Sequence, residues 1–294
     1  MELTVKQGRR EFFRSAGIAG LGAASALAVL KIGEGNAQAQ QTQPGFHRDT
    51  PAQLFTAALI AEDLATTFYY NALVGKVIQD PALAGPGGTA LNPGSSGDAN
   101  NVSYVRAALG QEFAHAGLLR SLLKIAGPSA SPVQTFYFPA ATFDNLATDG
   151  TTPSFIGTLE TLENAFIGAY LTAVRAFAYM AAQTEAHLGN YYVLNGSTLS
   201  SDTLAYFSQV SASIMGVECE HRALGRDIAD LAPADNLYYE STDGLDGVYN
   251  GPNSAVVALT PFLTPSNGAA YQLADAVSNL TDLVLPSTGA PPAF

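Results

Sequence analysis

The sequence predicts an all-α protein: an antiparallel four-helix bundle with a long crossover between its second and third helices and an irregular C-terminal tail. Three observations predict it. Four long stretches between residues 51 and 231 repeat apolar residues at helical spacing. Two of these stretches contain a Glu-x-x-His motif, at residues 112–115 and 218–221. Residues 127–152 form a connection too long for neighbouring antiparallel helices but suited to a crossover along the bundle.

Composition narrows the class of protein. The 294-residue chain is 47% hydrophobic and 13% charged, which fits one sizeable domain with extra segments, or at most two domains. A formal net charge of −12 argues against nucleic-acid binding. The single cysteine, Cys219, excludes an intrachain disulfide and cysteine clusters for zinc or iron–sulfur ligation. We expect Cys219 to be a small packed residue outside any site.

Residues 1–39 are predicted to be an export signal. Arg9 and Arg10, followed by Phe12, resemble a twin-arginine signal, although Gly8 and Phe13 depart from the common pattern. The apolar stretch of residues 16–30 has 15 residues, short of the roughly 20 that a spanning helix needs. Residues 37–39 read Ala-Gln-Ala, which fits a cleavage site. We therefore expect export to the periplasm or beyond, with no stable membrane span after cleavage; an uncleaved anchor is the alternative.

The first two helices each bring a carboxylate into an apolar stripe. Residues 50 and 51, Thr-Pro, start a helix that runs to about residue 79 with Glu62 in its stripe. Its neighbour Asp63 lies off the stripe and is expected to face water. After a surface loop at residues 80–101, a second helix spans about residues 103–126 with Glu112 and His115 on its apolar face. A spacing of three places both on one helix face.

The third and fourth helices repeat this pattern. The third is predicted to start at Thr152-Pro153 and to weaken near residue 189, with Glu163 in its stripe and Glu160 three residues earlier; both could point inward. The fourth is predicted from about residue 201 to 231, and its periodicity places Glu218 and His221 inward and Glu220 outward.

The remaining segments carry no catalytic motif. Aromatic residues 136–138 in the crossover are expected to pack against the helices. Residues 232–294 are rich in Pro, Gly, Asn and Ser, with an apolar run at residues 255–263 and one further short helix expected within residues 271–285. The predicted domains are thus a signal at 1–39, a bundle at 40–231 and a C-terminal extension at 232–294 that wraps the bundle or mediates association into a homo-oligomer.

Six inward groups share one chemical logic: Glu62, Glu112, His115, Glu163, Glu218 and His221. Bare carboxylates and imidazoles are costly to bury, and a metal pair removes that cost. Oxygen and nitrogen ligands without thiolates suit two iron or two manganese ions, with iron slightly preferred. No catalytic residue beyond these ligands is predicted. In the alternative reading some of the six lie on the surface and the bundle holds no metal.

The same motifs resemble the ferritin-like superfamily and, within it, exported bacterial proteins related to the plant desiccation-related protein. The resemblance covers about residues 52–230 and is carried by residues 61–69, 112–115, 162–170 and 217–221. Ala61 and Ala65 depart from the family's Leu-Glu-Tyr-Leu-Glu type run, but Glu62 remains. The resemblance implies a dinuclear site in the bundle and favours Glu163 over Glu160 as the ligand.

Three further residues could support the ligands by hydrogen bonding. Tyr69 and Tyr170 each lie seven residues after a proposed ligand and therefore on the same helix face as that ligand. Each could act as a hydrogen-bond donor, as a radical carrier or as a packing residue. Glu160 could accept a hydrogen bond from a ligand histidine.

The sequence leaves three functions open. The leading hypothesis is an oxidoreductase whose metal pair reacts with dioxygen or peroxide, by ferrous oxidation or, like manganese catalase, by peroxide removal. The second is a non-enzymatic stress or desiccation protein with a structural metal site. The third, an iron store, would need a closed shell of subunits.

Overall fold

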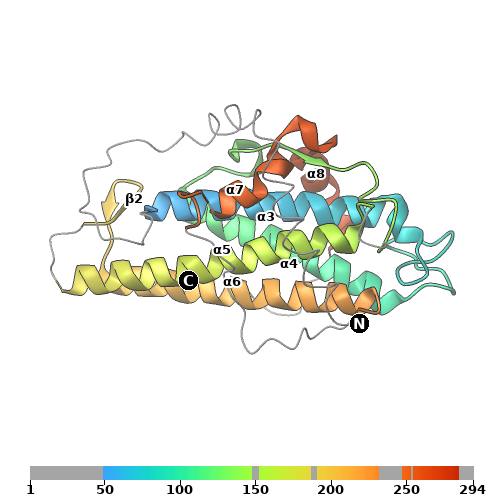
Figure 1. Cartoon of the computed structure of the whole chain (residues 1–294), viewed down its shortest axis with the longest axis horizontal. Helices are drawn as coiled ribbons and strands as arrows, with labels where there is room; N and C mark the ends of the chain where they lie inside the picture. Colours follow the sequence, from blue (N-terminus) through green and yellow to red (C-terminus); the bar gives the residue numbers. More distant parts are fainter. Residues whose placement is uncertain (1–48, 148–151, 187–190, 232–246, 253, 285–294) are drawn as a thin grey trace.

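The computed structural model describes residues 49–147, 152–186, 191–231, 247–252 and 254–284. The predicted export signal lies outside these residues. The main elements are four long helices: α3 (Pro51–Val74), α4 (Ala99–Leu123), α5 (Phe155–Glu185) and α6 (Ser201–Ile228). They lie lengthwise beside one another, with α3 packed on α4 and α5 packed on α6 (Figure 1). The predicted four-helix bundle is therefore confirmed.

Local capping residues fix where the helices begin. Thr50 and Gln53 form a reciprocal capping box before α3, with Pro51 in the first turn as predicted. Helix α4 begins earlier than predicted because the Asp98 carboxylate accepts hydrogen bonds from the first free amides. Helix α5 begins later, because Ser154 rather than Thr152 caps it through the amide of Gly157.

The crossover carries the chain back along the bundle, so that α4 and α5 run in the same direction (Figure 1). It contains strand β1 (Thr135–Phe138) and a 3-10 turn, η2 (Pro128–Ala130). Phe138 of β1 packs on Phe68 of α3 with ring centroids 5.7 Å apart, and Phe68 stacks on Phe155 of α5 at 5.0 Å. The predicted packing of residues 136–138 against the helices is confirmed.

The described part of the C-terminal segment is more ordered than the irregular tail that was predicted. It contains α7 (Ala255–Leu259), the 3-10 turns η3 (Thr260–Leu263) and η4 (Pro265–Asn267), strand β4 (Ala269–Gln272) and α8 (Leu273–Leu283). Strand β4 pairs antiparallel with β1, and α8 packs on α3. The predicted helix within residues 271–285 is present, but the strand pair was not predicted. A second small sheet joins β2 (Val193–Leu194) to β3 (Ser197–Thr198) before α6, and η1 (Lys76–Gln79) follows α3.

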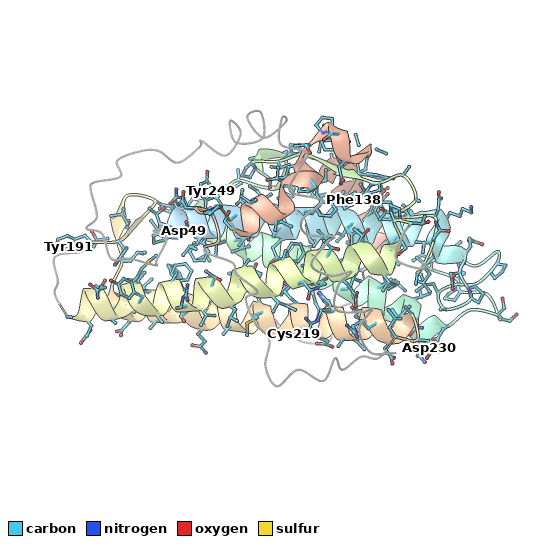
Figure 2. All side chains as sticks on the ribbon, in the orientation of Figure 1. Asp49, Phe138, Tyr191, Cys219, Asp230 and Tyr249 are labelled. Atoms are coloured by element: carbon cyan, nitrogen blue, oxygen red, sulfur yellow. The ribbon has the colours of Figure 1, made fainter. Side chains whose placement is uncertain are left out.

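The buried carboxylate of Asp49 attaches residues 248–250, in the C-terminal part of the chain, to the start of the bundle. Asp49, next to Tyr249 in Figure 2, accepts hydrogen bonds from the amides of Val248, Tyr249 and Asn250 at 2.8–2.9 Å. Three amides converging on one carboxylate satisfy a turn that would otherwise have unpaired buried donors. Residues 248–250 are thereby held next to the start of α3.

Helix α5 is long and apolar enough to cross a membrane by length and composition, and it is the one such helix among the described residues. Its apolar window is 56% buried inside the bundle, where it packs on α6 and contacts α3. This burial accounts for its apolar character as that of a core helix.

Candidate metal centre

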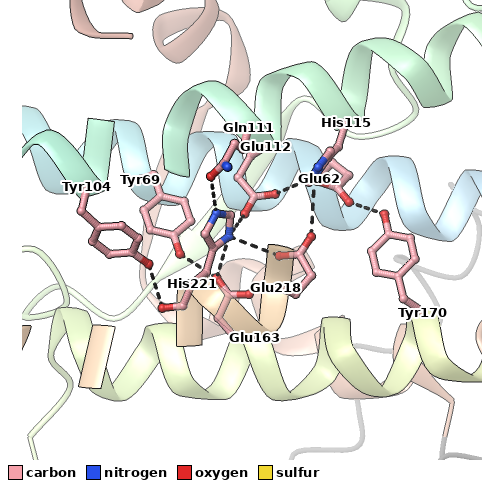
Figure 3. A network of polar contacts seen from close by, with 10 residues as sticks. All are labelled: Glu62, Tyr69, Tyr104, Gln111, Glu112, His115, Glu163, Tyr170, Glu218 and His221. Atoms are coloured by element: carbon pink, nitrogen blue, oxygen red, sulfur yellow. Dashed lines mark hydrogen bonds and ion pairs between the residues drawn. The ribbon is translucent and has the colours of Figure 1, made fainter. Parts of the chain in front are cut away.

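The four long helices bring all six predicted ligands to one place inside the bundle (Figure 3). Helix α3 contributes Glu62, α5 contributes Glu163, and α4 and α6 each contribute one Glu-x-x-His pair. The four carboxylates are at most 2% exposed, and His221 is fully buried. The side chain of His115 is 14% exposed.

The six side chains form two overlapping sets of four. One set is Glu62, Glu112, His115 and Glu218; the other is Glu112, Glu163, Glu218 and His221. Within each set one ligand atom from every residue lies within 4.8 Å of the others. Glu112 and Glu218 belong to both sets, so these two carboxylates could bridge a pair of cations, with one Glu-His pair left for each.

Both histidines direct Nδ1 toward the carboxylates. His115 Nδ1 lies 3.2 Å from Glu62 and 3.6 Å from Glu218, and His221 Nδ1 lies 2.8 Å from Glu112 and 3.4 Å from Glu218. A neutral imidazole with its proton on Nε2 presents a lone pair at Nδ1, which is the form that binds a metal.

Orphaned polar atoms support a metal at this position. Both oxygens of Glu112 and of Glu218, one oxygen of Glu163 and Nδ1 of His221 are buried without a hydrogen-bond partner among the described residues. The 2.8 Å approach of His221 Nδ1 to Glu112 is therefore an ion-pair distance without hydrogen-bond geometry. Buried polar atoms are costly when unpaired, and these atoms converge on one space. The donor set fits two oxygen-preferring cations of the iron or manganese type.

The electrostatics of the metal-free site lead to the same conclusion. Burial raises the pKa of the Glu112, Glu163 and Glu218 carboxyls, and the neighbouring carboxylates raise them further. Burial alone would lower the pKa of His115 and of His221, but the surrounding glutamates raise both well above the usual value. Without a cation the cluster therefore retains protons that a bound metal would displace.

Two tyrosines bind the outer carboxylates reciprocally. Tyr69 on α3 donates a 2.6 Å hydrogen bond to Glu163 on α5, and Tyr170 on α5 donates one to Glu62 on α3 (Figure 3). Burial and the adjacent carboxylates raise the pKa of both phenols well above 10, so both remain donors. The sequence placed both tyrosines on the ligand faces of their helices as possible donors, and the structure shows that each donates to the ligand on the facing helix.

Two predicted roles need correction. Glu160, suggested as an acceptor for a ligand histidine, instead lies 3.1 Å from Arg226 and is partly exposed. Asp63, expected to face water, is 1% exposed and forms a buried ion pair with Arg120, which also donates to Ser131 at 3.0 Å. The face of α3 that periodicity predicted to be exposed to solvent is instead covered by α4 and the crossover. Burial raises the pKa of Asp63 to about 6, although Arg120 lowers it.

Sequence reasoning missed two residues that contact His221. Gln111 Oε1 lies 2.9 Å from His221 Nε2, and Tyr104 Oη donates a 2.7 Å hydrogen bond to the His221 carbonyl. Gln111 could have been suspected, because it directly precedes Glu112 in the motif. Glu220 is exposed, and Cys219 lies half-buried on α6 in neither ligand set (Figure 2), both in line with the helical periodicity.

Comparison with known families agrees with this architecture. Residues 50–187 match the family model described as the ferritin-like domain. No curated protein and no solved structure gives a significant match. The matched range contains α3, α4 and α5 with four of the six ligands, and α6 completes the bundle and the cluster. Residues 50–187 of this chain therefore form a ferritin-like domain.

Proposed function

We propose that this protein is an exported di-metal carboxylate oxidoreductase of the ferritin-like superfamily, related to the bacterial homologues of the plant desiccation-related protein. Its substrate in this proposal is dioxygen or peroxide, used for ferrous oxidation or for peroxide removal. The observation that carries the proposal is the pair of ligand sets that share Glu112 and Glu218. When bound, two iron or two manganese ions would supply two electrons by cycling between the +2 and +3 states.

The residues of the chain would hold and tune that pair. Glu62 with His115, and Glu163 with His221, would each serve one position, and Glu112 and Glu218 would serve both. Tyr69 and Tyr170 hold the outer carboxylates in place through their hydroxyls. The closed surroundings keep bulk water from four acidic groups, so each charge acts at low effective dielectric.

The experiment compares wild type with His115→Ala, His221→Ala and the double variant, each loaded with iron or manganese. Elemental analysis gives metal per chain, and turnover is measured as peroxide consumption and as ferrous oxidation above buffer. Each single change should remove most of the activity, and the double change should add little, as for groups that act as a unit. Far-ultraviolet circular dichroism must remain helical in every variant.

A structural metal site in a stress or desiccation protein is the second candidate. This candidate is favoured because each of the four long helices contributes at least one ligand side chain, so that bound cations would cross-link the whole bundle. In that case metal removal lowers the melting temperature, while no variant or wild type turns over faster than free metal. Two metals per chain together with that pattern would decide against the oxidoreductase.

A further inference from the structure

The two halves of the cluster have matching ligands but different surroundings. Each half has one outer glutamate, one histidine and the two shared carboxylates. Each outer glutamate also accepts a tyrosine hydroxyl from the facing helix. The surroundings of the two histidines differ, and this difference would decide how readily each position exchanges its metal.

The imidazole of His221 is enclosed on every side that the structure describes. Its outer nitrogen, Nε2, lies 2.9 Å from Gln111 Oε1, and its backbone carbonyl accepts the Tyr104 hydroxyl. The ring meets Tyr69 edge to face with centroids 5.6 Å apart, and no part of the residue is exposed. A histidine held at its outer nitrogen, its ring and its backbone has no low-energy way to swing off a metal.

His115 is held by fewer contacts. Its side chain is 14% exposed, and all of its polar contacts among the described residues are made by Nδ1, to Glu62, Glu112 and Glu218. No residue in the described part of the chain caps its outer nitrogen. Water can therefore hydrate this ring as it moves, which lowers the cost of leaving the metal.

We infer that the ions at the two metal positions exchange with solution at different rates. The Glu163–His221 position retains its ion, and the Glu62–His115 position releases and rebinds its ion. Gln111 is the positioning residue responsible, acting through His221. Its Oε1 accepts the Nε2 proton of His221, which fixes the neutral tautomer with the Nδ1 lone pair toward the cluster. The inference rests on the proposed function only in requiring that the chain binds two ions. The exchangeable position would then be the one where an external molecule meets the pair.

The test measures metal release from the full-length protein loaded with two equivalents of Mn²⁺ and mixed with excess EDTA. Wild type should release its manganese in two equal phases separated by about tenfold or more in rate, in the range that supporting hydrogen bonds contribute to metal affinity. Gln111→Ala should speed the slow phase by about 10- to 100-fold and leave the fast phase unchanged. Gln111→Glu keeps an acceptor for the Nε2 proton, so its slow phase should have the wild-type rate. Gln209→Ala, at an exposed glutamine of α6, is the matched control and should behave like wild type.

The variant His115→Ala assigns the phases, because it should keep one manganese that leaves at the slow rate. Release of both ions in one phase, or equal acceleration of both phases by Gln111→Ala, would overturn the inference while leaving two-metal binding intact. Failure of wild type to bind two ions would defeat the proposed function, and the inference with it. Circular dichroism of each variant separates a specific effect on release from lost folding.

Discussion

Replacing Glu218 by glutamine should change stability in opposite directions with and without metal. Glu218 is fully buried, and neither of its oxygens has a hydrogen-bond partner among the described residues. Burial raises the pKa of its carboxyl, and the charge of Glu112 raises it further. In the metal-free protein the buried charge of this carboxylate therefore lowers stability, and in the proposed metal-bound protein it would be a ligand shared by both positions.

The size of the effect follows from the geometry. Ligand oxygens of Glu218 and Glu112 lie within 4.8 Å of each other. Two like charges about 5 Å apart repel by roughly 3 kcal/mol at an effective dielectric of about 20. The neutral amide removes this repulsion and can donate to a remaining carboxylate. We expect the unfolding free energy of the metal-free Glu218→Gln protein to rise by about 1–3 kcal/mol, because His115 and His221, at 3.6 and 3.4 Å from Glu218, offset part of the repulsion.

With metal present the order should reverse. Wild type gains a stabilisation that grows with metal concentration over the dissociation constant, and the variant loses a ligand from both positions. Urea unfolding followed by circular dichroism, with chelator and then with Mn²⁺, measures both differences. Glu220→Gln changes an exposed carboxylate and should stay within about 0.5 kcal/mol in both conditions. A metal-free Glu218→Gln protein that is less stable than wild type by more than about 1 kcal/mol would refute the reasoning.

Three further predictions test other parts of the structure. Tyr170→Phe should weaken one of two metal-binding steps by about 10- to 100-fold in calorimetric titration, because Glu62 loses its donor, whereas Tyr191→Phe at a 79% exposed position should not. Arg120→Met should lower the free energy of unfolding in urea by about 3–5 kcal/mol, because it leaves Asp63 buried without its partner. Adding Asp63→Leu should recover most of that loss, and equal stability of Arg120→Met and wild type would contradict the prediction. Replacing both twin arginines with lysine should leave unprocessed precursor in the cytoplasm, as seen by fractionation, and normal appearance of the processed chain outside it would count against export.

The sequence alone determined which residues converge. Helical periodicity selected Glu218 over Glu220 and placed Glu62 in an apolar stripe, because a helix presents every third or fourth residue to the same neighbour. On the third helix periodicity left Glu160 and Glu163 both possible, and the resemblance to the ferritin-like superfamily favoured Glu163. The Glu-x-x-His spacing and the long crossover then implied a four-helix bundle with a shared interior site, and the fold agrees. These features are local, and local geometry follows from the order of residues.

Only the tertiary structure decided which helix supports which ligand. Tyr69 donates a hydrogen bond to Glu163 on the facing helix, and Gln111 contacts His221 across the bundle. Asp63 forms an ion pair with Arg120 instead of facing solvent. Periodicity gives the face on which a residue lies, but not what covers that face or which side chain stands opposite it. Those contacts depend on how far each helix is shifted along its neighbour and on where the crossover lies, and both are set by packing between residues far apart in the chain.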